Sequence, residues 1–339
     1  MAACEHSPAG SVQVTRLGPR DSALPRRLTY STLNDRTPSV SGDVIVYARQ
    51  GPGYADPHYS PLGREECLAF LPVEGGTLEK LYCPHALLPA ADPFVNTWFE
   101  PSLSPDGSRI AFTWQRGPQV GPQSFYYAGL IVAPTDRPAD TTQVRRSVQY
   151  TDPGPPVRRS DFAARVTWVG SDRLRFLATQ EVISLLDPPL PGRTTDTAYV
   201  PLALMELDVT SGAMSVVPGG DSVIAYAAAP EGGIWVVREA RPDELLLLDP
   251  ASGARTVVGH FSSAASDLID LDSTAVAVVD GGNTIERLDV PTGARQQLTG
   301  FAGPVRHIAA AGGRRLVAEI ETATLPYGAP SDLWLLGFP

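Results

Sequence analysis

Three copies of one short phrase recur at a nearly constant spacing in the second half of the chain. The copies are Asp208-Val-Thr-Ser-Gly-Ala213, Asp249-Pro-Ala-Ser-Gly-Ala254 and Asp289-Val-Pro-Thr-Gly-Ala294, which start about 40 residues apart. Each phrase follows an apolar run and precedes a β-prone run, which predicts a strand, a tight turn and a second strand. A period of about 40 residues that is built from strands is typical of a β-propeller.

The composition agrees with a chain of many short strands. Its 339 residues include 31 Gly and 33 Pro, which suit frequent turns and disfavour long helices. With 43% hydrophobic and 19% charged residues, the chain is expected to be globular rather than disordered. We therefore predict an all-β protein with a single β-propeller domain over residues 21–339, after an N-terminal extension of residues 1–20.

The positions of the strand pairs predict the number of blades. Six first strands are expected, near Pro38, Pro101, Arg165, Tyr226, Asp267 and His307. The last residues, 332–339, fit the third strand of the last blade, and the segment 27–29 is expected to supply its missing fourth strand. This predicts a six-bladed β-propeller closed by an N-terminal strand; if the stretch 185–190 forms a further blade, the number is seven.

One stretch of the chain matches a known repeat. Pro101-Ser-Leu-Ser-Pro-Asp-Gly107 predicts a short strand and a turn, in which Gly supplies a positive φ, and an apolar strand from Arg109 to Trp114 follows. This stretch resembles the TolB-like propeller repeat, which also builds the propeller of prolyl-oligopeptidase-type enzymes. The resemblance implies a β-propeller fold. It does not imply hydrolase activity, because those enzymes carry a separate hydrolase domain and this chain has no G-x-S-x-G motif.

The charge of the chain limits its expected partners. The net charge is −10 and the isoelectric point is near 5.0, so the surface is expected to repel phosphate backbones, and nucleic acid is not expected as a partner. No stretch approaches the roughly 18 apolar residues of a membrane span, and the N-terminus lacks the basic and apolar regions of a signal peptide. The sequence therefore predicts a cytoplasmic protein with no membrane partner.

Neither a metal site nor a cofactor is indicated by the sequence motifs. The five histidines show no metal-ligand spacing, and there is no P-loop and no G-x-G-x-x-G motif after a strand. The three cysteines, Cys4, Cys67 and Cys83, have no CxxC spacing. We expect Cys67 and Cys83 to be small core residues of one hairpin; a redox or metal-binding pair is the alternative.

Long insertions are expected on one face of the propeller only. They fall in the connections 51–66, 116–124, 182–199 and 322–331, which belong to neighbouring blades and predict a one-sided wall over the central channel. Long loops on a rigid scaffold often bind ligands, although such loops can also simply close a channel. Aromatic side chains with polar groups suit an organic ligand. We therefore assign ligand binding to six residues in or near this wall: His58, Tyr59, Trp98, Tyr127, Asp161 and Tyr327.

A second set of candidate residues lies at the predicted channel mouth. Alignment of the blades places six residues at equivalent positions before the first strands: Thr37, Glu100, Ala164, Ala225, Ser266 and Arg306. Glu100 and Arg306 are the charged members, and His307 follows directly. A carboxylate, a guanidinium and an imidazole can perform acid–base catalysis or hold an anionic substrate, so these three are the candidate catalytic residues. The alternative is a structural ring of ion pairs around the channel.

Two classes of function fit this architecture. The first is a recognition module whose loop-walled face binds a small molecule, a peptide or a protein partner. The second is a stand-alone enzyme without a cofactor, such as a cyclase, lyase or isomerase of bacterial specialised metabolism, which would act through shape and a few polar groups. An enzyme is expected to bury its charged groups and shift their pKa values, whereas a recognition module is expected to show a broad aromatic surface with its charges paired.

Overall fold

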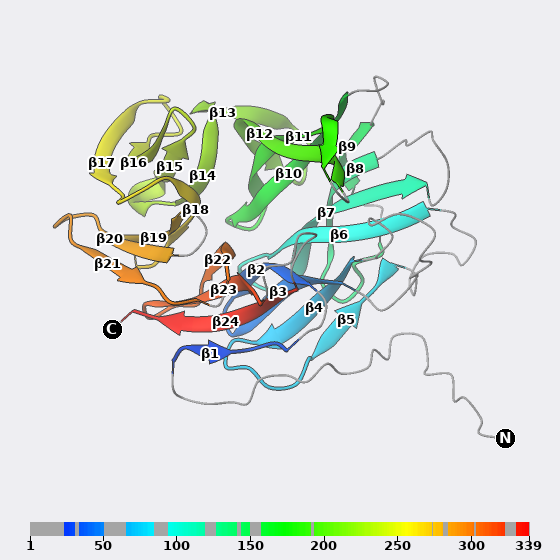
Figure 1. Cartoon of the computed structure of the whole chain (residues 1–339), viewed down its shortest axis with the longest axis horizontal. Coiled ribbons are helices and arrows are strands. Elements are labelled where there is room, and N and C mark those ends of the chain that lie inside the picture. The colour runs from blue at the N-terminus through cyan, green and yellow to red at the C-terminus, as the bar shows by residue number, and fades with distance from the viewer. Residues whose placement is uncertain are drawn as a thin grey trace.

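The described residues form an all-β protein whose sheets surround a common centre. The computed structural model describes residues 24–30, 34–50, 66–84, 94–118, 127–140, 144–149, 157–190, 193–272, 274–280, 284–301, 303–322 and 330–338. These ranges contain twenty-four strands and the short 3-10 helix Pro230–Gly232. The sheets stand side by side in a ring, which is a propeller-like arrangement (Figure 1). The predicted N-terminal extension, residues 1–20, lies outside the described residues.

Three of the sheets each consist of four antiparallel strands that are consecutive in the chain. The first holds β10 (Val157–Val169), β11 (Arg173–Leu190), β12 (Arg193–Asp208) and β13 (Met214–Asp221). The second holds β14 (Val223–Ala228), β15 (Ile234–Arg238), β16 (Arg241–Leu248) and β17 (Arg255–His260). The third holds β18 (Ala265–Asp270), β19 (Ala275–Asp280), β20 (Thr284–Asp289) and β21 (Arg295–Leu298).

Strands β2 to β9 form one sheet of eight strands, where we expected two separate sheets. Its strands are β2 (Asp35–Ser41), β3 (Val44–Gln50), β4 (Glu66–Pro72), β5 (Lys80–Tyr82), β6 (Phe94–Leu103), β7 (Arg109–Pro118), β8 (Tyr127–Pro134) and β9 (Val144–Gln149). The antiparallel ladders β2–β5 and β6–β9 meet at a single parallel pair, Glu66 with Thr97. This one pair is the reason that the described sheets number five rather than the predicted six.

The last sheet is closed by the N-terminal part of the chain. It contains β22 (Val305–Ala310), β23 (Arg315–Glu321), β24 (Ser331–Gly337) and, beside β24, the short strand β1 (Arg26–Arg27). The β1 strand runs antiparallel to β24, and the Leu28 N–H then donates to the Leu333 carbonyl at 2.7 Å. The predicted closure by an N-terminal strand is therefore confirmed, and it covers an edge of β24 that would otherwise be open.

The three repeated phrases form the turns that their composition predicts. In the first, the Gly212 N–H donates to the Asp208 carbonyl at 2.9 Å, and the Asp208 carboxylate accepts from the Ser211 N–H at 2.6 Å. Gly212 has a φ of 72°, a conformation that glycine adopts without steric cost. The other two phrases repeat this geometry, and the three turns join β12 to β13, β16 to β17 and β20 to β21.

All six predicted first-strand positions lie in the innermost strands of the ring, which are β2, β6, β10, β14, β18 and β22. These inner strands contact one another around the centre: β2 lies against β22 and β6, β10 against β6, and β18 against β14 and β22. The stretch 185–190 is the end of β11 and pairs with β12, so it does not form a separate sheet.

Apolar side chains fill the spaces between neighbouring sheets. Strands such as Ala275–Asp280 read as nearly continuous apolar runs because both of their faces are covered. One core cluster, for example, joins Val279 and Ile285 of one sheet to Leu316 and Leu336 of the next. The sheets are therefore held in the ring mainly by burial of aliphatic surface.

Cys67 and Cys83 are core residues of the β4–β5 hairpin, as expected, but they are joined by a disulfide, which was not predicted. The register of β4 and β5 places Leu68 opposite Tyr82, which brings the next two residues, the cysteines, face to face with their Cα atoms 4.4 Å apart. Both side chains are buried. Structural disulfides are typical of oxidising compartments. The pair therefore gives no support to a cytoplasmic location, which stays a prediction.

No helix in the described part of the chain is long and apolar enough to cross a membrane.

Candidate functional site

Each of the six inner strands is interrupted by a bulge or irregularity in its pairing. The six positions that the blade alignment made equivalent lie at these irregularities. Four of them lie inside an irregularity: Thr37, Glu100, Ser266 and Arg306. The other two, Ala164 and Ala225, are paired residues directly beside one. Thr37, Glu100 and Arg165 have φ values of 49°, 52° and 57°. Bulges re-aim side chains, and non-glycine residues in this region of φ are frequent at functional sites.

Arg165, at the bulge of β10, connects three sheets near the centre of the ring. Its Nη1 donates to Asp267 Oδ2 of β18 at 2.9 Å and contacts Nδ1 of His307 on β22. The Arg165 side chain is 20% exposed and the His307 side chain 22% exposed, whereas Asp267 is buried. Arg165 and His307 are thus the members of this group that solvent or a ligand can reach.

Three carboxylates fix the backbone of neighbouring strands around this centre. Glu100 Oε2 accepts from the Arg165 N–H at 2.8 Å, which joins β6 to β10. Asp267 Oδ2 accepts from the Ile308 N–H at 2.8 Å, which joins β18 to β22. Glu319 Oε2, on β23, accepts from the Thr37 N–H of β2 at 2.9 Å. These bonds favour a structural role for the carboxylates; a catalytic role for Glu100 stays a prediction. We call Arg165, His307, Glu319, Asp267 and Glu100 the axial cluster.

The protonation of His307 follows from its neighbours. Arginine is always a donor, so Nδ1 of His307 accepts from Arg165 and the ring proton lies on Nε2. Nε2 is 3.9 Å from Glu319 Oε2. Burial lowers the pKa of His307 well below its ordinary value, and the cations Arg165, Arg36 and Arg306 lower it further. His307 is therefore a neutral imidazole at pH 7, with its Nε2–H directed toward Glu319.

The pKa values of the carboxyl groups in the axial cluster are raised, whereas that of His307 is lowered. Burial raises the pKa of Glu319 to about 7, although the Thr37 N–H and the nearby arginines partly offset the effect. Burial also raises the pKa of Glu100 and of Asp267, again with a partial offset from Arg165. At neutral pH, Glu319 is therefore a carboxyl group that can take up or release a proton beside a neutral imidazole.

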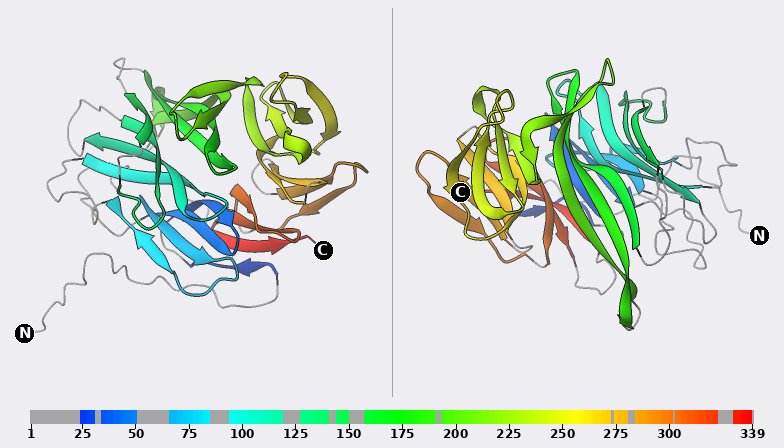
Figure 2. Two further views of the ribbon diagram at one scale, coloured as in Figure 1. Left: turned by 180° about the vertical axis from the view of Figure 1, so that it is seen from behind. Right: turned by 90° about the horizontal axis from the view of Figure 1, so that it is seen from above.

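The wall on one side of the ring is built from strands rather than only from loops. We call the side of the ring where the inner strands begin the entry face. On this side, β6 pairs with β7 over residues 94–99 before its bulge, and β10 pairs with β11 over residues 157–164. In β14, β18 and β22, only one residue is paired before the bulge. The β11–β12 hairpin extends well beyond the other strands (Figure 2). The inner strands β14, β18 and β22 are therefore short on this side.

The four connections that were predicted as loops of this wall are either strands or largely outside the described residues. The connection 182–199 was expected to be a loop, but it is the paired end of β11 and β12, with one register irregularity between Leu185 and Leu190 and a last pair of Leu190 with Arg193. The stretch has no alternation of apolar and polar residues to mark a strand, and its prolines favoured a loop. The expected insertions 51–66, 116–124 and 322–331 lie largely outside the described residues.

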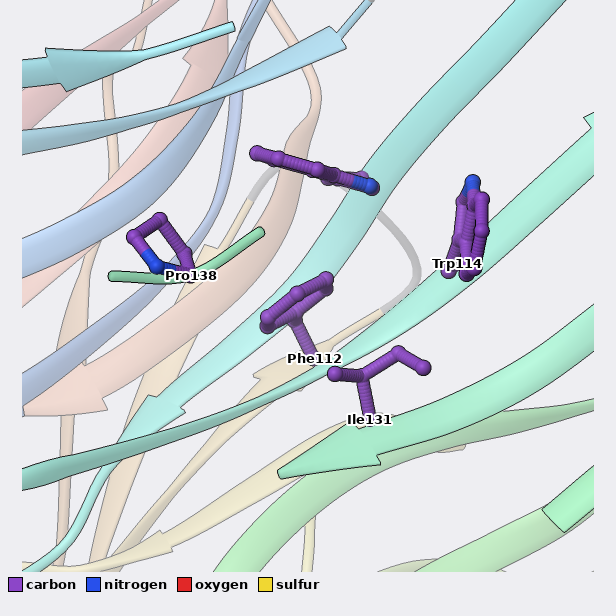
Figure 3. A pocket seen from close by; sticks show the side chains of 5 residues that line it. Phe112, Trp114, Ile131 and Pro138 are labelled. Atoms are coloured by element: carbon purple, nitrogen blue, oxygen red, sulfur yellow. The ribbon is translucent and has the colours of Figure 1, made fainter. Parts of the chain in front are cut away.

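Trp98 lies in the hydrophobic core rather than on an open surface. Its side chain is 2% exposed, and its ring packs on Phe112 with the ring centroids 5.2 Å apart. The hollow beside it, of about 160 Å³ including open solvent, is lined by Trp98, Phe112, Trp114, Ile131 and Pro138 and has no space for a water-sized molecule (Figure 3). Packing between β6, β7 and β8 therefore explains this tryptophan, and we do not place it in the candidate site.

The other predicted ligand-binding residues are only partly described. His58, Tyr59 and Tyr327 lie outside the described residues. Tyr127 is the first residue of β8. Asp161 lies on β10, in the part of the ladder that forms the wall, where it is opposite Gln180. The ligand-binding roles of these five residues stay predictions.

Arg306 lies at the rim of the axial cluster and not within it. Its side chain is 52% exposed and pairs with Glu321 at 2.6 Å. Arg165 supplies the central cation instead, although it directly follows the aligned residue Ala164. Glu319 was not among the predicted site residues, although the sequence contains a signal for it: it is a charged residue inside the apolar run 316–320, and such a residue is buried only with polar partners.

A Glu319→Gln variant is expected to change how stability depends on pH. The pKa of Glu319 is about 7 in the folded protein against 4.5 ordinarily, so the folded state holds the proton more tightly and its contribution to stability is lost as pH rises from 4.5 through 7. Glutamine keeps an acceptor for the Thr37 N–H but cannot titrate. The free energy of unfolding, measured with urea, is expected to fall between pH 4.5 and pH 7 by about 3 kcal/mol more in the wild type than in the variant.

Asp35 titrates in the same pH range. Burial raises its pKa to about 7 as well, so it contributes a fall of the same sign in both proteins; the charge of Glu319 adds to this rise, so Glu319→Gln also makes the contribution of Asp35 smaller, in the same direction as the loss of Glu319 itself. Equal slopes in wild type and variant would contradict the assignment of a raised pKa to Glu319.

In the described part of the chain, no group of three or more His, Cys, Asp or Glu residues is arranged to hold a metal ion.

Comparison with known proteins shows the fold but no family. No protein-family model and no curated protein sequence matches the chain. A gluconolactonase structure from Xanthomonas campestris is 13% identical, with a TM-score of 0.50 over 99% of this chain and 100% of that one. A virginiamycin B lyase structure from Staphylococcus aureus is 12% identical, with a TM-score of 0.48 over 93% of this chain and 98% of that one.

A puromycin hydrolase structure is also similar, with 15% identity and a TM-score of 0.45. The match covers 90% of this chain but 52% of the hydrolase, so the chain spans about half the length of that protein. At these identities the likeness concerns the fold alone. The ring of antiparallel sheets and the likeness to the gluconolactonase structure together identify an all-β protein of propeller-like architecture.

Proposed function

We propose that the protein binds a small molecule at the entry face, over the axial cluster. One observation carries the proposal: Arg165 and His307 are each about one-fifth exposed, while Asp267, which accepts from the Arg165 guanidinium and from the Ile308 N–H, is buried. The cluster thus offers a cation and a neutral imidazole in a fixed arrangement. Ligand sites commonly combine a few such polar groups with a rigid scaffold.

The surrounding architecture supports this proposal. Glu100, Asp267 and Glu319 accept hydrogen bonds from backbone N–H groups of neighbouring strands, so Arg165 and His307 are oriented before a ligand arrives. The strand wall of β6, β7 and β10–β12 stands on one side of the cluster and adds contact surface there.

The proposal includes the number of blades and the type of propeller repeat. The ladders β2–β5 and β6–β9 share only one residue pair, so we count them as two blades and the ring as six-bladed. The turn at Ser104–Ser108, in which Asp106 accepts from the Ser104 hydroxyl at 2.5 Å, is the local structure behind the TolB-like resemblance.

A second candidate function is a cofactor-independent enzyme, such as a lyase, isomerase or cyclase. The observation that favours it is the pKa of Glu319, which burial raises to about 7, together with its distance of 3.9 Å from Nε2 of His307. A group with a pKa near the working pH is suited to general acid–base catalysis. A broad aromatic docking surface for a peptide or protein is less well supported, because Trp98 is buried in the core.

Native mass spectrometry of the protein purified from its own host tests the proposal. A small molecule is expected to be bound to the wild type and to an Arg173→Ala variant, but to be lost from an Arg165→Ala variant. Arg173 is the matched control, because its side chain is 49% exposed, pairs with Glu206 at 2.9 Å and lies at the end of β11 away from the entry face. Retention of the small molecule by Arg165→Ala, or a bound protein in its place, would contradict the proposed site.

A further inference from the structure

We infer that the ligand carries a carboxylate, which binds to the Nε–Nη2 edge of the Arg165 guanidinium. This inference rests on the proposed function and deepens it by naming the chemical class of the ligand. It is carried by the donors that the axial cluster leaves available and by the arrangement of arginines around His307.

The guanidinium of Arg165 is engaged on one side only. Nη1 takes both described partners, Asp267 and His307. In the described residues no acceptor lies within hydrogen-bond distance of Nε or Nη2, and neither atom is among the fully buried polar atoms. These two nitrogens form the planar fork that binds the two oxygens of a carboxylate. Since Asp267 and the backbone hold Arg165 in place, little conformational freedom remains to be lost on binding.

His307, which contacts Arg165 through Nδ1, offers a further donor at Nε2. Its proton lies on Nε2, and the described acceptor in front of it, Glu319 Oε2, is 3.9 Å away, which is beyond a hydrogen bond. An oxygen of the ligand can therefore accept from Nε2–H without displacing an existing bond.

The charges around His307 also favour an anion, although the chain as a whole has a net charge of −10. Arg165 contacts the imidazole and Arg306 precedes it in the chain. Arg36 precedes Thr37, whose N–H binds Glu319. All three arginines lower the pKa of His307, which indicates that they create a positive potential there. Such a local field attracts an anionic ligand even to an acidic protein.

A ligand with a single negative charge fits this setting better than one with several. Each of these arginines already pairs with one carboxylate: Arg165 with Asp267, Arg36 with Glu66 and Arg306 with Glu321. These three pairs have no net charge, so the positive potential is confined to the surroundings of the imidazole, and additional negative charges on a ligand would approach the buried carboxylates Asp267 and Glu319. A monocarboxylate satisfies the fork of Arg165 without that repulsion.

Benzoate and benzamide are the probes that test this inference, because they have nearly the same shape and differ in charge. Each is titrated into the full-length protein while the ring signals of His307 are followed by NMR, with a His307→Asn variant for assignment. Benzoate is expected to bind saturably and to raise the pKa of His307, because it adds a negative charge beside the imidazole. Benzamide is expected to have no such effect.

Variants of Arg165 show whether this residue is the one that binds. Arg165→Ala is expected to weaken benzoate binding about 10- to 100-fold, the usual value of a charge-assisted bidentate contact. Arg165→Lys keeps the charge beside Asp267, and therefore the fold, but has no planar fork, so it is expected to weaken binding as well. Arg173→Ala, which removes an equal charge elsewhere, is expected to bind benzoate as the wild type does.

Three results would overturn the inference. Equal binding of benzamide and benzoate would mean that the site does not recognise the charge, and the proposed small-molecule site would survive without it. Unchanged benzoate binding in both Arg165 variants would move the carboxylate away from this residue. Absence of saturable benzoate binding after the co-purified small molecule has been removed by refolding from urea would exclude carboxylate recognition, while the proposed function would still hold if that small molecule rebinds.

Discussion

A Trp98→Ala variant is expected to lose about 3–5 kcal/mol of its free energy of unfolding, which is the usual cost of truncating a large buried aromatic side chain. Trp98 is 2% exposed and belongs to a core cluster that joins β3, β4 and β6 to β7 and β8. Its neighbours in this cluster include Val46, Phe70, Phe112 and Ile131. Removal of the indole leaves a void between two ladders that meet at only one backbone pair, so little else compensates for the lost packing.

Urea unfolding monitored by circular dichroism measures this loss, and ligand binding provides the second observable. Because Trp98 packs in the core, a Trp98→Phe variant is expected to be less destabilised than Trp98→Ala and to keep its bound small molecule in native mass spectrometry. If Trp98→Phe instead kept full stability and lost the small molecule, Trp98 would be a ligand-binding residue, as the sequence analysis first predicted.

Replacement of Asp332 by alanine is expected to destabilise the protein by about 3–4 kcal/mol, because it removes one partner of a buried ion pair. Asp332 lies on β24, is 0% exposed, pairs with Arg27 of β1 and accepts a hydrogen bond from the Thr29 hydroxyl at 3.2 Å. The Thr29 hydroxyl in turn accepts from the Leu333 N–H at 2.9 Å. The expected loss is at the low end for a buried pair because Arg27 keeps 29% exposure.

This pair also joins the two ends of the described chain, so its loss is expected to loosen the closure of the ring. Hydrogen exchange of the β1 and β24 amides is expected to accelerate in Asp332→Ala more than exchange in β14–β17. Asp136→Ala is the matched control, because Asp136 pairs with Arg137 where both side chains are about 70% exposed, and such pairs contribute about 0–1 kcal/mol. A similar loss of stability in both variants would contradict a special role for the closure.

The axial cluster combines two functions that usually compete. Glu100, Asp267 and Glu319 hold neighbouring strands together, yet burial raises their pKa values, which means that the folded protein carries them at some cost in free energy. Arg165 and His307 remain partly exposed on top of this framework. The proposed binding site thus lies where the sheets already have to be connected, and the fold itself would fix its geometry.

Much of the fold could be predicted because its signals are local. The phrase beginning at Asp208 contains, within six residues, the capping carboxylate and the glycine that its turn requires. The six inner strands could be located for the same reason, and so could the pairing of the N-terminal segment with β24, since an unpaired strand predicts a partner.

The residues of the candidate site were harder to predict because they depend on the bulges. A bulge moves every following side chain by one position, and the sequence carries no clear mark of where it occurs. The alignment therefore chose Ala164 where the structure uses Arg165, and it gave Arg306 a central place that the structure does not. The disulfide of Cys67 and Cys83 was missed for a similar reason, because the register of β4 with β5 decides that the two sulfur atoms meet.

The sequence by itself determined the strand content, the repeat of about 40 residues and the closure by an N-terminal strand, because turn residues and apolar alternation act between neighbours in the chain. Only the tertiary structure decided which charges meet at the centre of the ring. Arg165, Asp267 and His307 come from three sheets. In the chain, Asp267 lies 102 residues and His307 lies 142 residues from Arg165. Their contact depends on the bulge positions and on the packing of whole sheets, and no local pattern contains that information.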